Sequence, residues 1–455
     1  MKLYNTKTRK IEELTPLSKE YISMYHCGPT VYDYAHIGNL RSFVFADTLR
    51  RACQINGFDV KQVMNITDIG HLTDDGSHGD DKMVKAIKRE GQEFSLKGLR
   101  HVADFYANAL KEDLKKLHIL PAHEYPYASD HIQEQIELIE RLEKKGHTYT
   151  TSDGVYFSTE SDPSYGVLGG LADEGDEKAR IEEQGEKKDR RDFALWKFSD
   201  NEIGWTSPWG LGFPGWHIEC SAMSMKYLGE SFDIHTGGID HISIHHNNEI
   251  AQSECATGKE MAQIWMHNAF LNMTDFKMSK STGNTLTLRT LEEKKISPSA
   301  YRLLLLQAHY RSPLEFSWEA LQSVETAYTR LKTHVSSLPA SEEDIENDYT
   351  KELKEHLSSD LQTPKAIALL FSIEKDALLS DKERYSTYKV FDTALGLGLF
   401  EKEIEREIPD HIKDIAKERD NARENKEWQL SDTLRDQIQN EGFEVSDTKE
   451  GTVVK

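Results

Sequence analysis

The chain has 455 residues, more than one hydrophobic core usually holds, so we expect several domains. Its longest aliphatic run, residues 303–306, is far too short to cross a bilayer, and no long apolar segment follows the basic N-terminus, so we expect neither membrane insertion nor secretion. The formal net charge of −22 argues against a protein that coats nucleic acid indiscriminately, but it leaves room for a specific nucleic-acid partner on a local basic face.

The amino-terminal part of the chain predicts one strand–helix–strand unit. Residues 20–27 mix aromatic and apolar side chains, as a buried strand does. Apolar residues recur at helical spacing within 39–57, where Gly57 ends the helix, and residues 58–66 predict the next strand. Such a βαβ unit predicts an α/β fold with a Rossmann-like, doubly wound parallel sheet.

The rest of the chain alternates helices and strands before it becomes mainly helical. The segment 171–192 is so dense in charged residues that we expect a solvated loop, inside an insertion between two halves of the fold. The other predicted elements are helices within 95–145, a strand at 154–159, helices at 216–229 and 247–258 with a strand and turn at 231–240 between them, helices from about 295 to 399, and two charged helices with a small β element in the tail.

Two short motifs carry a signal for phosphate chemistry. "HIGN" (36–39) lies where the predicted strand gives way to the helix, and a helix N-terminus offers unpaired N–H groups to a phosphate. Gly38 allows close approach to the backbone, and His36 can donate to a phosphate oxygen. A turn with a solvent-facing histidine would explain this motif equally well by itself.

"KMSKS" (277–281) adds a short cationic loop. Its Lys277 and Lys280 can grip a triphosphate and neutralise charge as pyrophosphate leaves. An ordinary basic turn is the alternative. The order of the two motifs, one in each predicted half of the fold, argues against that alternative.

The stretch "HHNNE" (245–249) predicts half of a metal site. Residues four apart on a helix share a face, so His245 and Glu249 point the same way. His246 instead shares a helix face with Ile250, so we expect its side chain to pack in the interior or against a neighbouring residue. His241 is a rival ligand four residues before His245. The metalloprotease motif H-E-x-x-H is absent, which argues against a metallohydrolase.

The cysteines offer the missing ligands. Four cysteines are too few for a disulfide framework in so long a chain, and they indicate a reducing cytoplasm. Zinc takes about four ligands from Cys, His or carboxylate side chains. Cys27, at a strand end beside "HIGN", and Cys220, in a predicted helix, are the remaining candidates. We interpret Cys53, on a core helix face, and Cys255 as structural.

Together these motifs resemble the cysteinyl-tRNA synthetase family of the class I aminoacyl-tRNA synthetases. The resemblance lies in "MYHCGPTVYDYAHIGNLRSF", "GWHIECSAMS", "FDIHTGGIDHISIHHNNEIAQSE" and "KMSKSTGN", over roughly residues 1–315 and more weakly in the tail. One departure is Asn39, where the general class signature ends in histidine. The resemblance implies ATP-dependent ligation of L-cysteine to the tRNA for cysteine through a cysteinyl-adenylate, with Mg²⁺ accompanying ATP. We expect a cytoplasmic monomer with no membrane association.

The resemblance also implies residue roles. One zinc ion would be held by Cys27, Cys220, His245 and Glu249 and would recognise the substrate thiol. The implied catalytic residues are His36, Asn39, Lys277 and Lys280. The implied ATP-binding residues are His36, Gly38, Gly237, Gly238, Asp240 and Lys280. The implied cysteine-binding residues are Gly28, Thr67, Trp216 and His235. From local sequence alone, a helix N-cap would also explain Asp240, and an ordinary core position would explain Trp216.

With these roles, the chain divides into five expected regions. They are 1–120, the first half of the catalytic domain; 121–205, an inserted connective region; 206–295, the second half with the zinc site and the KMSKS loop; 296–400, a helical region contacting the tRNA stem; and 401–455, a small domain on the anticodon side. The tail cations that could contact tRNA are Lys413, Lys417, Arg419, Arg423, Lys426 and Arg435, although interleaved acidic residues also fit a solvated helix pair.

Two other functions fit the motifs. A related ligase could pass activated cysteine to a small amine instead of tRNA, but the long helical region after "KMSKS" favours tRNA. A non-catalytic, zinc-containing paralogue is the other alternative. The intact "HIGN" and lysine motifs argue against it.

Overall fold

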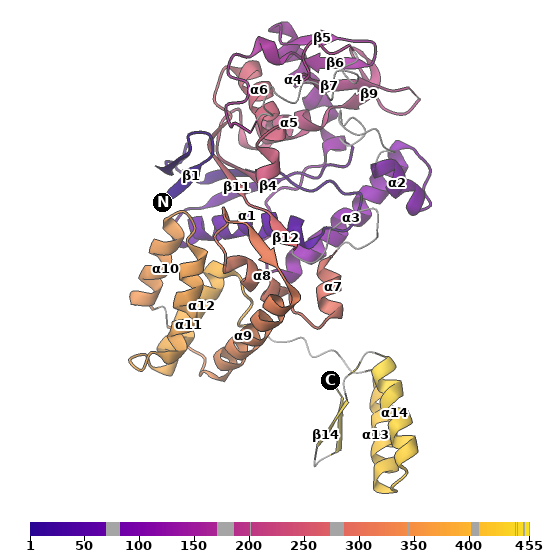
Figure 1. Ribbon diagram of the computed structural model, residues 1–455, viewed down its shortest axis with the longest axis vertical. Helices are drawn as coiled ribbons and strands as arrows, with labels where there is room; N and C mark the ends of the chain where they lie inside the picture. The colour runs from indigo at the N-terminus through magenta and orange to yellow at the C-terminus, as the bar shows by residue number, and fades with distance from the viewer. Residues whose placement is uncertain are drawn as a thin grey trace. The chain divides into compact units, whose positions relative to one another are not determined.

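The computed structural model describes residues 1–69, 82–170, 186–200, 202–273, 286–343, 345–401, 409–441, 443, 445–448 and 451–454. The chain forms two compact units, residues 1–400 and 401–455 (Figure 1). Lys277 and Lys280, and most of the charged segment 171–192, lie outside the described residues. Within the described ranges, no helix is both long enough and apolar enough to span a bilayer.

A four-stranded parallel sheet forms the centre of the first unit. Its strands are β3 (Ile22–His26), β4 (Val60–Met64), β10 (Phe232–Gly238) and β11 (Ala262–Asn268), in the order β11-β10-β3-β4. The chain runs from β3 through α1 (Ile37–Ile55) to β4 on one side, and from β10 through α6 (His245–Thr257) to β11 on the other. The direction of winding therefore reverses between β3 and β10, where ligands bind in such sheets. The predicted doubly wound α/β fold is confirmed.

Helices cover both faces of this sheet. In Figure 1, α1 lies on one face, while α5 (Trp216–Leu228) and α6 lie on the other. Beyond α5 and α6 stands a second, antiparallel sheet of order β5-β6-β7-β9-β8. Its strands are β5 (Thr148–Thr150), β6 (Gly154–Phe157), β7 (Phe193–Phe198), β8 (Trp205–Ser207) and β9 (Gly210–Pro214), and α4 (Ile132–Lys144) packs beside it.

The sequence predicted only one strand of this second sheet. That strand is β6, and it was found within 154–159. The first four residues of β7 are buried, so β7 does not show the polar–apolar alternation of a half-exposed strand. The sheet also continues through β9 past the expected boundary at residue 205.

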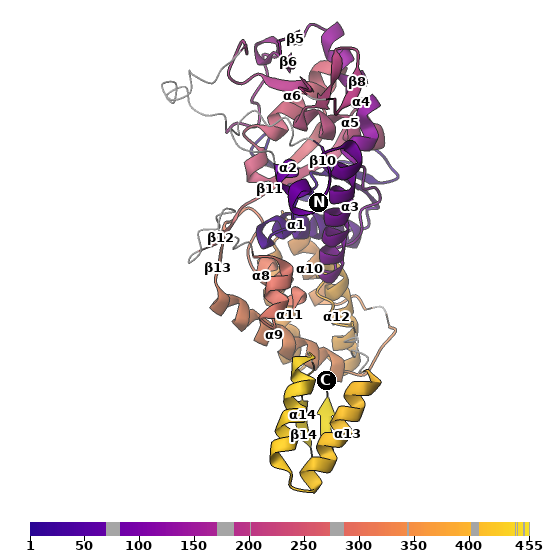
Figure 2. The same ribbon diagram turned by 90° about the vertical axis from the view of Figure 1, so that its right-hand side faces the viewer.

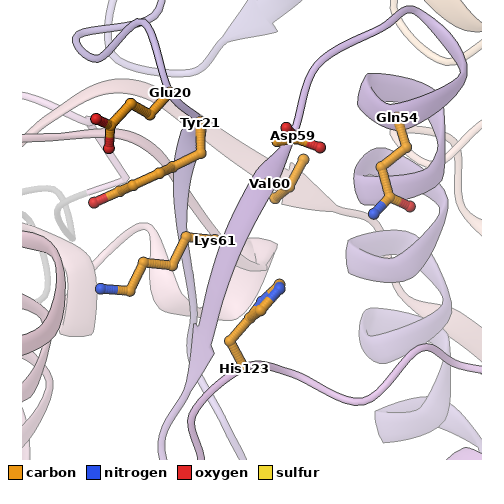
Figure 3. A pocket seen from close by; sticks show the side chains of 7 residues that line it. All are labelled: Glu20, Tyr21, Gln54, Asp59, Val60, Lys61 and His123. Carbon is orange, nitrogen blue, oxygen red and sulfur yellow. The ribbon is translucent and has the colours of Figure 1, made fainter.

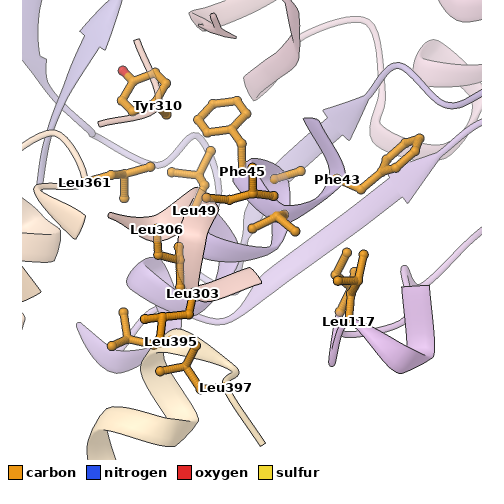
Figure 4. Close-up of a cluster of buried hydrophobic side chains, with 14 of the residues drawn as sticks. Phe43, Phe45, Leu49, Leu117, Leu303, Leu306, Tyr310, Leu361, Leu395 and Leu397 are labelled. Atoms are coloured by element: carbon orange, nitrogen blue, oxygen red, sulfur yellow. The ribbon is translucent and has the colours of Figure 1, made fainter. Parts of the chain in front are cut away.

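Helix α1 is buried between the sheet and a helical region formed by residues 298–395. The helices of that region are α8 (Pro298–Leu306), α9 (Trp318–Ser337), α10 (Asp348–Ser358), α11 (Thr363–Ser372) and α12 (Asp381–Leu395) (Figure 2). Phe43, Phe45 and Leu49 of α1 pack in one apolar cluster with side chains such as Leu303 and Leu395 (Figure 4). The helical region therefore shares its hydrophobic core with the central sheet.

The remaining elements are short or peripheral. They are β1 (Lys2–Asn5), β2 (Lys10–Glu13), α2 (Lys82–Arg89), α3 (Leu96–Lys116), η2 (Ala128–His131), η3 (Thr159–Ser161), η6 (Ile239–His241), β12 (Leu271–Met273), α7 (Leu288–Glu293), β13 (Leu314–Phe316) and η8 (Ile373–Lys375). The second unit contains α13 (Asp410–Glu424), α14 (Trp428–Asn440), β14 (Val445–Thr448) and β15 (Gly451–Val454). The tail sequence predicted two helices and a small β element, and that element is the antiparallel pair of β14 and β15.

Candidate active site and metal centre

The candidate site lies at the carboxyl ends of β3 and β10. Gly28 follows β3, and its backbone N–H donates to Asn65 Oδ1 at 2.8 Å. A Cβ atom on Gly28 would stand 1.6 Å from the Asn65 carbonyl oxygen, so no other residue fits there. Thr67, just past β4, donates from Oγ1 to Glu219 Oε2 at 2.9 Å. These two of the four predicted cysteine-binding residues therefore contact the protein's own groups at the edge of the site.

Four predicted ligands meet at this point. Cys27 Sγ lies 4.0 Å from Cys220 Sγ and 3.6 Å from Glu249 Oε1, and His245 Nε2 lies 2.9 Å from the same carboxylate oxygen. One potential ligand atom of each lies within 4.8 Å of the others, and all four residues are buried. Two thiols, an imidazole and a carboxylate form a donor set that suits zinc.

A second donor set overlaps the first. It contains Cys27, His235, His246 and Glu249, again within 4.8 Å of one another. His246 Nε2 lies 3.3 Å from Cys27 Sγ, and His235 Nε2 lies 2.8 Å from Glu249 Oε2. The sequence predicts that His246 lies against packing or a neighbour, and its contact with Cys27 is with such a neighbour. Position on the helix does not by itself separate the two histidines as ligands, because residues 245–253 of α6 are all buried and both faces of its first turns meet protein.

Further histidines orient the two adjacent ones. His245 Nδ1 lies 2.8 Å from His217 Nδ1, and His246 Nδ1 lies 2.8 Å from His267 Nε2. A metal-binding imidazole usually bonds through its other nitrogen in this way, which fixes its tautomer and orientation. His217 and His267 were missed by the sequence analysis. No spacing rule links residues on α5 and β11 to a motif on α6.

Electrostatics favour a cation in this cluster. Burial raises the pKa of Glu249, but His235 and His245 outweigh it and hold that pKa well below its usual range. Burial lowers the pKa of His245, but Glu249 and Cys220 raise it to about 10. The bond from Cys27 lowers the pKa of Cys220 to about 6, whereas burial raises that of Cys27. Glu249 and Cys220 thus carry negative charge away from water beside a protonated His245, and a bound metal ion would replace that proton as the neutralising positive charge.

The "HIGN" motif forms the start of α1. His36 is the N-cap, and its Nδ1 accepts a hydrogen bond from the Asn39 backbone N–H at 3.1 Å. Asn39 Oδ1 accepts from the His36 N–H at 3.3 Å, which completes a capping box. A Cβ on Gly38 would lie 3.0 Å from His36 Nδ1, so the glycine makes room for this cap. Because Nδ1 accepts, a neutral His36 carries its proton on Nε2, where it can donate to a ligand.

Three of the predicted ATP-binding residues lie at the carboxyl end of β10: Gly237 and Gly238 are its last residues, and Asp240 follows in η6. A Cβ on Gly237 would lie 2.6 Å from His241 Nδ1, and one on Gly238 would lie 2.2 Å from Asp240 Oδ1. Both glycines therefore leave space for nearby side chains. Asp240 makes no N-cap bond to η6 or α6, and its side chain is 58% exposed, so the N-cap alternative is wrong.

Trp216 lies at the site and not in the core. It is the first residue of α5 and is only partly buried, with its ring centroid 4.5 Å from that of His245.

Comparison with known proteins decides the family. Residues 13–326 match the family model described as the tRNA synthetases class I (C) catalytic domain. Cysteine–tRNA ligase 1 of Burkholderia lata is 43% identical over 455 residues, covering 99% of this chain and 95% of the relative. Cysteine–tRNA ligase of Treponema denticola is 40% identical over 485 residues, covering 98% of each. This chain belongs to the cysteine–tRNA ligase family. The family resemblance predicted from sequence is confirmed.

A solved structure supports the same fold. Mycobacterium tuberculosis methionyl-tRNA synthetase in complex with methionyl-adenylate aligns with a TM-score of 0.55 at 14% identity, covering 83% of this chain and 91% of that chain. At this identity the likeness concerns the fold alone. For a member of the cysteine–tRNA ligase family, the buried donor cluster is consistent with zinc. The individual residue roles stay predictions.

A separate open pocket lies at the other end of the central sheet. It is lined by Glu20, Tyr21, Gln54, Asp59, Val60, Lys61 and His123 (Figure 3). Val60 and Lys61 are the first residues of β4, whereas the donor cluster lies beyond the last residues of β3. None of the predicted site residues of this family member lines this pocket.

Proposed function

We propose that this member of the cysteine–tRNA ligase family activates L-cysteine with ATP and transfers it to the tRNA for cysteine. One observation supports the proposal most strongly: a buried cluster of two thiols, an imidazole and a carboxylate lies at the switch point of a doubly wound sheet. The amino terminus of α1 opens at the same end of the sheet.

The proposed reaction has two steps. The cysteine carboxylate attacks the α-phosphorus of ATP, and pyrophosphate leaves. A terminal ribose hydroxyl of the tRNA then attacks the acyl carbon, and AMP leaves. Both steps depend on positioning and charge stabilisation. His36 Nε2 and the Gly38 N–H would hold phosphate oxygens, and Lys277 and Lys280 would neutralise the leaving pyrophosphate, with Mg²⁺ on ATP.

The donor cluster would hold one zinc ion through Cys27, Cys220, His245 and Glu249. A bound zinc ion would supply a soft Lewis acid that favours a thiolate over a hydroxyl. Serine is nearly isosteric with cysteine, and shape alone separates such pairs by only about 1–3 kcal/mol. Trp216 and Thr67 would line the pocket around the substrate, and the cluster would supply the remaining selectivity without a separate editing site.

Contact of the tail with tRNA also belongs to the proposal. Arg419 is 1% exposed and donates to Asp447 Oδ1 at 2.6 Å, so its role is to hold the second unit together. Arg423 and Arg435 also pair with Asp447 but stay partly exposed. Lys413, Lys417 and Lys426 are exposed and are the better candidates for phosphate contact. A cytoplasmic monomer is part of the same proposal.

The deciding experiment is aminoacylation of purified tRNA with labelled cysteine, with serine as the control and with and without a zinc chelator. We expect cysteine to be attached, serine to be rejected, and the chelator to lower the cysteine-over-serine ratio. Cysteine-dependent ATP–pyrophosphate exchange without tRNA charging would point instead to a ligase with a small-amine acceptor. Loss of both reactions would point to a non-catalytic paralogue.

A further inference from the structure

A buried arginine anchors the first turns of α1. Arg41 Nη2 donates to the Ser312 carbonyl oxygen at 2.6 Å, and its Nη1 donates to the Phe270 carbonyl oxygen. Phe270 precedes β12 and Ser312 precedes β13, and these two strands pair in parallel. One guanidinium therefore joins the start of α1 to the entry of both strands. Its planar fork can serve two carbonyls at once, which a lysine ammonium on a flexible stem does less well.

Arg41 carries its positive charge in a buried position. The residue is 3% exposed, and among the described residues no carboxylate lies within ion-pair distance of it. Arg51 and Arg302, by contrast, share the carboxylate of Asp47. A buried guanidinium that pairs with none of the described carboxylates costs folding free energy even when carbonyls accept its hydrogen bonds, so a functional gain is expected in return. At the start of α1 this charge adds to the positive end of the helix dipole, which favours a bound anion.

A second buried side chain holds the same turn. Tyr301 on α8 is fully buried and donates from its hydroxyl to the Ile37 carbonyl oxygen at 2.6 Å. The Ile37 N–H donates in turn to the Leu286 carbonyl oxygen at 2.9 Å. The hydrogen-bond partners of this turn from outside α1 therefore lie between residues 270 and 312. These residues follow β3, α1 and β4 in the chain.

We propose that Arg41 is a positioning residue for adenylate formation. It holds the first turn of α1, with His36 and Gly38, at a fixed place relative to β12 and β13. Its charge also strengthens that turn as a seat for the phosphates of ATP. Tyr301 supports the same turn from α8. This inference rests on the proposed function, because its effect is measured in the activation of cysteine.

The test compares Arg41→Lys and Arg41→Gln with the wild type in cysteine-dependent ATP–pyrophosphate exchange. Arg41→Lys keeps the positive charge but loses the planar guanidinium that donates to two carbonyls. We therefore expect kcat to fall about 10- to 100-fold. Arg41→Gln also loses the charge, so kcat should fall further and the KM for ATP should rise. The KM for cysteine should stay unchanged in both variants, because the donor cluster is untouched. Tyr301→Phe, which loses one hydrogen bond, should lower kcat about 2- to 10-fold.

Arg302→Lys is the matched control. Arg302 is a buried arginine that also donates to two carbonyls, those of Leu395 and Leu117, but it is paired with Asp47. We expect Arg302→Lys to lower the Tm without changing kcat.

An Arg41→Lys kcat within twofold of wild type would overturn the inference, as would an equal kcat loss in Arg302→Lys. If neither Arg41 variant folds, an unchanged kcat in Tyr301→Phe would overturn it. Absence of exchange in the wild type would instead overturn the proposed function itself.

Discussion

At the scale of single residues, two overlapping donor sets could each hold one metal ion. Cys27 and Glu249 belong to both sets, so the choice lies between Cys220 with His245 and His235 with His246. Both adjacent histidines are buried, and both bond a further histidine through their Nδ1 atoms. The first set contains two sulfur ligands and the second only one. A second thiolate makes a site softer and tighter for zinc, so we expect the first set to hold the ion.

Substitution of one member of each set tests this choice. Cys220→Ser should lose zinc, because a hydroxyl is a poor replacement for a thiolate ligand. His246→Gln should keep one zinc per chain, with an affinity lower by about 10- to 100-fold, as for residues that only orient ligands. Zinc content after dialysis is the measurement, and Cys255→Ser, outside both sets, is the control. Zinc retained in Cys220→Ser and lost in His246→Gln would assign the metal to the second set.

At the scale of elements, the start of α1 combines two tasks in His36. As the N-cap it satisfies the Asn39 N–H, and as the proposed phosphate ligand it presents Nε2 to ATP. The sequence indicated the phosphate contact, because helix N-termini bind phosphate. It did not indicate the cap, because histidine is not among the preferred N-cap residues, and the structure alone shows it.

His36→Asn separates the cap from the phosphate contact. Asparagine is a strong N-cap, so the Tm should change little, whereas the rate of ATP–pyrophosphate exchange should fall about 100-fold because the imidazole donor is gone. His36→Ala should lose both, with a cost of about 1 kcal/mol in unfolding free energy. A wild-type exchange rate in His36→Asn would mean that His36 is a cap alone.

At the scale of the whole first unit, an ion network joins the catalytic sheet to the helical region. Asp47 on α1 accepts from Arg51 Nε at 2.8 Å and from Arg302 on α8, which also donates to the Leu395 carbonyl oxygen at 2.7 Å. Burial raises the pKa of Asp47, but Arg302 and Arg51 outweigh it and hold that pKa below its usual value. The network and the shared apolar cluster explain why residues 1–400 form one compact unit.

This shift predicts a pH dependence of stability. Because the folded pKa of Asp47 is depressed, its contribution is present above the unfolded pKa of about 3.9 and is lost as pH falls through the folded value. Asp47→Asn should therefore lower the free energy of unfolding by about 3–5 kcal/mol at pH 7, since it leaves a buried guanidinium charge uncompensated. The difference should stay constant down to about pH 5 and shrink below about pH 4.

Urea unfolding of both proteins across this pH range is the measurement. Asp410→Asn serves as the control, because Asp410 is fully exposed and pairs, within the described part of the chain, with Lys413. A difference that grows as the pH falls would contradict the assigned ion network.

The sequence by itself determined the local features of this protein. Periodicity placed β3, α1, β4 and the tail helices, and "HIGN", "KMSKS" and the cysteines at 27 and 220 carried the family resemblance. Such features can be predicted from one continuous stretch of sequence, because they depend on the spacing or the type of its residues. His245 and Glu249 could be paired in this way because they share a helical turn.

Only the tertiary structure decided which distant groups meet. It brought His246, His217 and His267 to the donor cluster, placed Arg41 on the carbonyls of Phe270 and Ser312, and merged the helical region with the catalytic core. The physical reason is that burial on all sides erases periodicity. At the start of α6 every side chain from 245 to 253 is buried, and the packing of other elements determines which group each one contacts.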